Sequence, residues 1–295
     1  MRLLYIVFGK QISNPAQASF SIASFLRYEG LVKSIDILTD YPDHFKYLAG
    51  LAEITTVTEE ELNDWKGPYQ FFWRVKIKAL QWMSRRYPGN AIVYLDTDTF
   101  LYSDPEAFGK LVQQKACMHL KEGPLSAASS KTEKLMWRQV RDKSMAGLNM
   151  GASLNMWNAG VVASPNTLGG KEFDLALELC DALCREQVTP RLIEQFALSV
   201  ALEETIGLAP AAPFVSHYWP NKEHWNAFIN QWLVTLFLSG RSFNESIRDF
   251  AAFDLADPHI QVQQRNTAIR LHRLVDAVFP PRKIETTVSP SNNTG

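Results

Sequence analysis

Short apolar runs alternate with amphipathic segments through the first hundred residues of the chain. Four runs have the length and composition of strands, at residues 3–8, 34–39, 52–58 and 91–95. The run at 3–8 is apolar throughout, which is typical of a strand covered on both faces. Residues 69–86 instead repeat apolar positions at helical spacing, and Asn14-Pro15 favours the start of an earlier helix. This alternation predicts an α/β fold with a doubly wound, mostly parallel sheet and helices on both faces.

The pattern is less regular beyond residue 105. Strand character returns at residues 156–163, and residues 246–279 have a largely helical pattern. Residues 280–295 are polar and contain Pro and Ser, so we expect a flexible tail there. Further helices are predicted at residues 131–142, 173–185 and 192–202.

The composition is that of a globular protein, with 46% hydrophobic residues. Thirty basic and 31 acidic residues leave a net charge of −1, so the chain as a whole has no attraction for nucleic acid or anionic membranes. No apolar run approaches the roughly 20 residues of a membrane-spanning helix, and the first run is too short for a secretion signal. The three cysteines, Cys117, Cys180 and Cys184, form no disulfide framework. We therefore expect a cytoplasmic protein.

Two acids, Asp96 and Asp98, directly follow the apolar run at 91–95. Alternate residues of a strand point to the same face, so both carboxylates are expected to leave the sheet together at its carboxyl edge. Ligands bind at this edge in open α/β sheets. Neighbouring carboxylates favour a cation between them, and hard oxygen ligands suit Mg2+ or Mn2+. The alternative interpretation is a solvated turn in which the acids bind only nearby backbone.

Residues 92–108 (IVYLDTDTFLYSDPEAF) resemble the DxD region of nucleotide-sugar glycosyltransferases with the GT-A fold. Four more segments resemble parts of these enzymes: a basic helix at 74–80, an Asn-Ala-Gly strand at 157–161, an acid-Gln pair at 194–195 and a His-to-Lys segment at 217–222. The last three resemble the glycogenin-like branch only loosely. Glu194 stands where that branch has Asp, and His217 is one residue closer to Lys222 than in its signature.

This resemblance implies a divalent metal, Mn2+ or Mg2+, bound to the diphosphate of the donor. Asp98 is the expected direct ligand, and Asp96 is expected to bind the metal, directly or through water, or the ribose. His217 is the expected third ligand, because Mn2+ accepts imidazole as well as carboxylate. A structural or surface role is the alternative for His217.

The resemblance also implies cations that contact the diphosphate. Lys222 and Arg74 are the expected residues, because a fixed cation stabilises charge that develops on a leaving group. Gly9 and Asp40 end the first two predicted strands, and we expect them to flank the nucleotide base and ribose. Arg74 also belongs to a basic cluster with Lys76, Lys78, Arg85 and Arg86. The alternative interpretation of this cluster is a solvated helix face.

On the sugar side, three residues are predicted to be catalytic. Asn158 and Gln195 are expected to hydrogen-bond sugar hydroxyls, which discriminates strongly between substrates. Glu194 is expected to bind the sugar or to act as a base. Trp219 is expected to stack on the donor, because it lies in the sequence between His217 and Lys222. The alternatives are amides that satisfy buried backbone and an acid on a helix surface.

Together these features predict one GT-A-like glycosyltransferase domain over residues 1–279. It would transfer a sugar from a nucleotide-diphosphate-sugar donor to an unknown glycosyl acceptor, without nucleic acid or an integral membrane segment. Two alternatives stay open: a haloacid-dehalogenase-like phosphatase with Asp96 as nucleophile, and a GT-A-shaped binding protein without turnover. Within the domain we expect a nucleotide-binding half at 1–105, an acceptor half at 106–240 and C-terminal helices at 241–279.

Overall fold

The computed structural model describes residues 1–253, 255, 271, 274–275 and 277–280. The chain divides into two compact units, Met1–Pro258 and His259–Gly295. In the second unit, residues 271, 274–275 and 277–278 are helical. Much of the predicted helical region 246–279, and the predicted tail from residue 281 onward, lie outside the described residues. The predicted extent of a single domain, and its subdivision, stay predictions.

Seven strands form the central sheet of the first unit. Their order across the sheet is β12-β6-β11-β4-β1-β2-β3, and β11 alone runs antiparallel to its two neighbours. The prediction of a mostly parallel α/β sheet is therefore confirmed. The strands are β1 (Arg2–Val7), β2 (Ser34–Thr39), β3 (Glu53–Thr56), β4 (Ile92–Leu95), β6 (Ala116–Met118), β11 (Val161–Ser164) and β12 (Leu208–Pro210).

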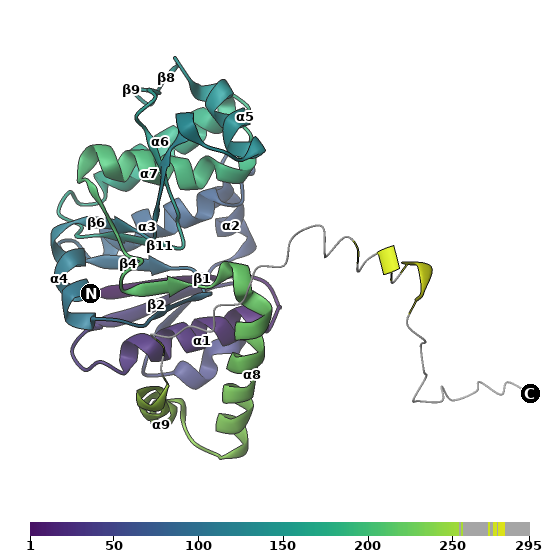
Figure 1. Cartoon of the computed structure of the whole chain (residues 1–295). Coiled ribbons are helices and arrows are strands. Elements are labelled where there is room, and N and C mark those ends of the chain that lie inside the picture. The colour runs from purple at the N-terminus through teal and green to yellow at the C-terminus, as the bar shows by residue number, and fades with distance from the viewer. Residues whose placement is uncertain (254, 256–270, 272–273, 276, 281–295) are drawn as a thin grey trace, which may run out of the picture. The chain divides into compact units, whose positions relative to one another are not determined.

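Helices cover both faces of this sheet, and each face has its own hydrophobic core. Figure 1 shows α1 and α8 on one side and α3, α6 and α7 on the other. The strands supply both cores by alternation, since Leu4 of β1 faces one core while Leu3 and Tyr5 face the other. The main helices are α1 (Ser13–Leu26), α3 (Arg74–Arg86), α4 (Pro105–Gln114), α6 (Lys171–Arg185), α7 (Ile193–Thr205) and α8 (Lys222–Leu238).

Short elements complete the first unit. Three two-stranded ladders join β5 (Thr99–Leu101) with β13 (Val215–His217), β7 (Lys121–Pro124) with β10 (Asn155–Trp157), and β8 (Ser144–Met145) with β9 (Leu148–Asn149). The remaining helices are α2 (Glu59–Lys66), α5 (Lys131–Val140), α9 (Phe243–Ser246) and five 3-10 helices at Pro42–Leu48, Leu125–Ala127, Pro190–Leu192, Trp219–Asn221 and Ile247–Ala252. Among the described residues, no helix combines the length and apolarity that crossing a membrane requires.

Several boundaries differ from the sequence predictions for identifiable reasons. The predicted helix at 69–86 begins only at Arg74, after a series of turns. The predicted strand at 156–163 is two strands, because residues 158–160 belong to neither β10, which pairs with β7, nor β11, which joins the central sheet. Helix α1 begins at Ser13 without a side-chain cap.

Helix α8 was not predicted, although Trp225, Ile229, Trp232 and Leu236 are buried at helical spacing. The helix also has large apolar residues on its exposed side, namely Val234, Phe237 and Leu238. These residues hide the helical spacing of the buried positions in the sequence.

Phe20 of α1 is the centre of the aromatic packing that holds α8 against α1. It is fully buried, and its ring centroid lies 5.9 Å from Trp225, 5.8 Å from Trp232 and 4.9 Å from Phe250. We expect Phe20→Ala to lower the free energy of unfolding by about 3–5 kcal/mol, because it leaves a cavity in this cluster. Urea denaturation measures the change. Ile12→Ala is the control, since Ile12 is 73% exposed. Equal stability of the two variants would contradict this packing role.

Candidate active site

The two acids lie in a turn rather than in a strand. Strand β4 ends at Leu95 and β5 begins at Thr99, so residues 96–98 connect two strands. Thr99 Oγ1 donates to the Asp96 carbonyl at 2.8 Å, and the Asp96 amide donates to the Gly160 carbonyl at 2.8 Å. Thr97 points away and donates to Gln17 Oε1 at 2.9 Å. The expected strand alternation is therefore wrong, but the turn still directs both carboxylates to one side.

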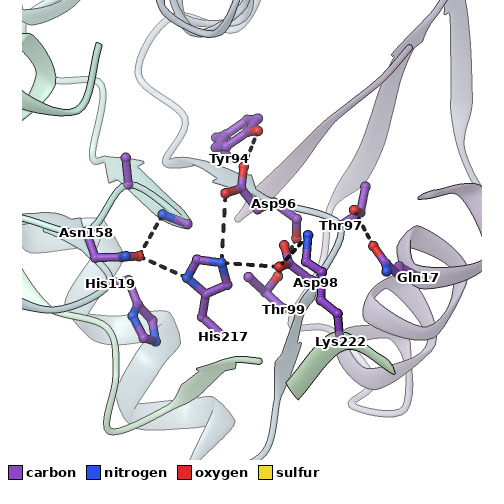
Figure 2. A network of polar contacts seen from close by, with 12 residues as sticks. Gln17, Tyr94, Asp96, Thr97, Asp98, Thr99, His119, Asn158, His217 and Lys222 are labelled. Atoms are coloured by element: carbon purple, nitrogen blue, oxygen red, sulfur yellow. Dashed lines mark hydrogen bonds and ion pairs between the residues drawn. The ribbon is translucent and has the colours of Figure 1, made fainter. Parts of the chain in front are cut away.

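His217 reaches these carboxylates through the small ladder beside the turn. Strand β13 pairs antiparallel with β5, which places His217 opposite Thr99. His217 Nε2 lies 3.5 Å from Asp98 Oδ2 and 4.0 Å from Asp96 Oδ2. One ligand atom from each of the three residues falls within 4.8 Å of the others (Figure 2). The predicted metal ligands are thus brought together.

Asn158 and Gly160 hold the imidazole of His217 in place. Asn158 Oδ1 accepts the Gly160 backbone N–H at 3.0 Å, which identifies that atom as the amide oxygen. His217 Nδ1 lies 2.9 Å from the same oxygen and must be the donor in that contact. Nε2 is therefore the ring nitrogen that faces the carboxylates and is available to a metal.

The chemistry of Asp98 fits a cation ligand. The residue is 4% exposed, and its buried Oδ2 accepts no hydrogen bond of good geometry. Lys222 Nζ lies 2.9 Å from this oxygen. Burial alone would raise the pKa of Asp98, but its neighbours His217 and Lys222 lower that pKa to about 2. Asp98 is therefore an ionised carboxylate with an oxygen that a metal can bind.

Lys76 is the buried cation of the site. Its Nζ lies 3.0 Å from Glu194 Oε1 and 3.4 Å from Asp96 Oδ1, and it donates to the Ala159 carbonyl at 3.2 Å. Burial opposes the charge, yet the two carboxylates raise the pKa of Lys76 above its usual value. Burial also raises the pKa of Glu194, against the opposing effect of Lys76. Tyr94 donates to Asp96 Oδ1 at 2.5 Å and completes this cluster.

Arg74 is bound elsewhere. Its Nε and Nη2 contact Asp181 at 2.7 and 3.0 Å, and its Nη1 donates to the Trp65 carbonyl at 2.9 Å. Two residues along a helix correspond to a rotation of about 200°, so Arg74 and Lys76 project from opposite sides of α3. The structure thus places Lys76 beside the predicted metal ligands and does not bring Arg74 there.

The other predicted residues surround the carboxyl edge of the sheet. The Gly9 amide donates to Asp40 Oδ1 at 2.8 Å, which joins the ends of β1 and β2. Gln195 Nε2 donates to Glu122 Oε2 at 2.8 Å, while Trp219 is 54% exposed. A pocket of about 250 Å³ opens at this edge, and Lys76, Asp96, Asp98 and Lys222 line it together with Phe72 and Trp73.

Sequence reasoning did not single out Glu122, Tyr94 or Lys76 as site residues. Glu122 comes from β7 and meets Gln195 of α7 only through the tertiary fold. In the sequence, Tyr94 has the pattern of an ordinary strand residue, and Lys76 is one of several cations on a basic helix. The one available signal was helical phase, because Lys76 shares its side of α3 with the buried apolar residues Ala79, Leu80 and Met83.

Comparisons with known proteins identify similar solved structures. No family model matches the sequence, and no curated protein does. One similar structure is that of the galactosyltransferase LgtC in complex with donor and acceptor sugar analogs, with 12% identity, a TM-score of 0.48 and coverage of 72% of this chain and 74% of that chain. Another is an active-site mutant of LgtC, with 12% identity, a TM-score of 0.47 and coverage of 71% and 72%.

Gly160 leaves room for the His217 ring, and a larger residue would displace it. A Cβ at position 160 would lie 2.2 Å from His217 Nδ1. We expect Gly160→Ala to weaken Mn2+ binding about 10–100-fold, because the ring can no longer face the carboxylates. Isothermal titration calorimetry measures the affinity.

Gly151→Ala is the matched control for that variant. The nearest atom to a Cβ at position 151 is 4.0 Å away, so we expect wild-type affinity. If Gly160→Ala binds Mn2+ as tightly as Gly151→Ala does, the placement of His217 is not required for metal binding.

His119 packs edge-on against His217 and gives the stability of the protein a pH dependence. Burial, and to a lesser extent the neighbouring His217, lowers the pKa of His119 from 6.5 to about 4, and His119 Nε2 contacts the Val215 carbonyl at 3.1 Å. Between pH 6.5 and 4 the unfolded chain therefore binds a proton at His119 that the folded chain does not. Stability should fall by about 2–3 kcal/mol as the pH drops through this range.

Urea denaturation of wild type and His119→Gln across this pH range tests the prediction. We expect the variant to lose less stability between pH 6.5 and 4, because glutamine does not titrate. Parallel pH curves for the two proteins would show that His119 is not responsible.

Proposed function

We propose that this protein is a metal-dependent glycosyltransferase, which moves a sugar from a nucleotide-diphosphate-sugar donor to an acceptor. The observation that carries the proposal is the convergence of Asp96, Asp98 and His217 beside a pocket that two lysines also line. A site that binds an anionic ligand through a divalent cation needs carboxylates for the cation and basic side chains for the anion, close together.

The residues favour Mn2+ over Mg2+. The donor set is two carboxylates and one imidazole, which Mn2+ accepts, whereas Mg2+ prefers oxygen ligands alone. Asp98 Oδ2, Asp96 and His217 Nε2 would hold the ion. When bound, it supplies Lewis-acid stabilisation of the diphosphate that leaves the anomeric carbon.

Lys222, Lys76 and Arg74 have different roles in this proposal. Lys222 is half-exposed in the pocket, and it contacts a phosphate oxygen of the donor. Lys76 is fixed between Glu194 and Asp96, so it balances their charge and holds Asp96 in position. Arg74 is paired with Asp181, so we assign the contact with the diphosphate to Lys222 and not to Arg74. Gly9 and Asp40 flank the nucleoside at the ends of β1 and β2.

The sugar lies on the other side of the metal ligands. Gln195 and Glu122 form a hydrogen-bonded pair, and Asn158 lies beside His217, so amide and carboxylate groups are available to sugar hydroxyls. Glu194 acts through its ion pair with Lys76, since it is only 8% exposed. Trp219 offers an exposed ring for the donor or acceptor.

A nucleotide-binding panel tests the proposal directly. Thermal shift assays with UDP, GDP, ADP and CDP, each with and without Mn2+, should identify at least one nucleotide that stabilises the protein only with the metal. The corresponding nucleotide sugars should then be hydrolysed or transferred. Binding without turnover would indicate a binding protein, and release of phosphate from an aryl phosphate would indicate the phosphatase.

Asp98→Asn should abolish the metal-dependent part of this response. We expect at least about a 100-fold loss of turnover, because the amide removes the charge that holds the cation. Glu106→Gln on α4 is the matched control, since it makes the same chemical change at an exposed carboxylate. An Asp98→Asn variant with wild-type Mn2+ dependence would refute the assigned ligand.

A further inference from the structure

Lys222 already places a positive charge on the Asp98 oxygen that the proposed metal would bind. Its Nζ is 2.9 Å from Asp98 Oδ2, the oxygen that also faces His217 Nε2 at 3.5 Å. Figure 2 shows the ammonium group reaching Asp98 from the opposite side to the imidazole. The same carboxylate oxygen therefore serves both the lysine and the proposed metal.

The two lysines of the site differ in how firmly they are held. Lys76 is 8% exposed and contacts two carboxylates and a carbonyl. Lys222 is 47% exposed, and within the described part of the chain it takes part in one ion pair, with Asp98. It is the first residue of α8, so its long side chain can swing while the helix stays packed. Lys222 is the cation that can leave.

We propose that Lys222 is a substitute cation, which neutralises Asp98 until a divalent metal displaces it. This inference rests on the proposed function. A buried carboxylate without a cation is costly, so a lysine that waits on Asp98 keeps the metal-free site stable. The lysine and the metal compete for Oδ2, because two cations held on one carboxylate oxygen repel each other.

Displacement would couple the metal to the anionic ligand. The expelled ammonium group enters the same pocket, where it becomes free to contact a phosphate oxygen. The metal thus prepares the site for the diphosphate, and the diphosphate captures the lysine that competes with the metal. Because linkage is reciprocal, each ligand should strengthen the binding of the other.

The test measures binding of Mn2+ alone to wild type, Lys222→Met and Lys222→Arg, by electron paramagnetic resonance of free Mn2+. We expect Lys222→Met to bind Mn2+ roughly tenfold more tightly than wild type, because the competing charge is gone. Lys222→Arg keeps the charge and should bind like wild type. With saturating Mn2+, Lys222→Met should bind the nucleotide selected by the panel more weakly than wild type.

The opposite signs of these two effects identify the substitute role. A lysine that only anchors α8 would weaken both bindings when removed, and melting temperatures report whether the variants fold alike. Equal or weaker Mn2+ binding by Lys222→Met, with wild-type binding intact, overturns the inference and leaves the proposed function standing. Absence of Mn2+ binding in all three proteins refutes the proposed metal centre, and the inference with it.

Discussion

The need to balance two neighbouring carboxylates determines the arrangement of this site. Asp96 and Asp98 lie in one turn, and Asp98 is nearly buried, so cations must stand beside them. Lys76 and Lys222 provide that charge, and they come from helices on opposite faces of the sheet. Both α3 and α8 begin near these acids, which brings one lysine to each carboxylate.

The sheet topology explains how distant residues meet at this edge. The parallel strands β1, β2 and β4 direct their carboxyl ends to it, whereas β11 runs the other way and brings in the residues that precede it. Asn158 and Gly160 therefore lie beside the acidic turn and receive the ring of His217. One antiparallel strand in the sheet is what allows an Asn-Ala-Gly segment to orient His217, the proposed metal ligand.

Much of the fold and part of the site could be predicted from the sequence. The strand at 34–39 matches β2, and the apolar run before Asp96 located the acids at a strand end. Their convergence was predicted for a wrong reason, because a turn set by Thr99 and Gly160 directs them rather than strand alternation. The choice between Arg74 and Lys76 depends on helical phase and on Asp181, which lies over a hundred residues away. Helical phase can be found in the local pattern, but the pairing of Arg74 with Asp181 cannot.

The central claim is that Asp96, Asp98 and His217 hold one divalent metal. Anomalous diffraction at the manganese edge, from crystals grown with Mn2+ and the nucleotide diphosphate that stabilises the protein, tests it most directly. The account predicts one strong peak within roughly 2–2.6 Å of Asp98 Oδ2 and His217 Nε2, with Lys222 moved from Asp98 to the diphosphate. A nucleotide bound in the pocket without a peak between these residues, or with its peak at another group, would contradict the account.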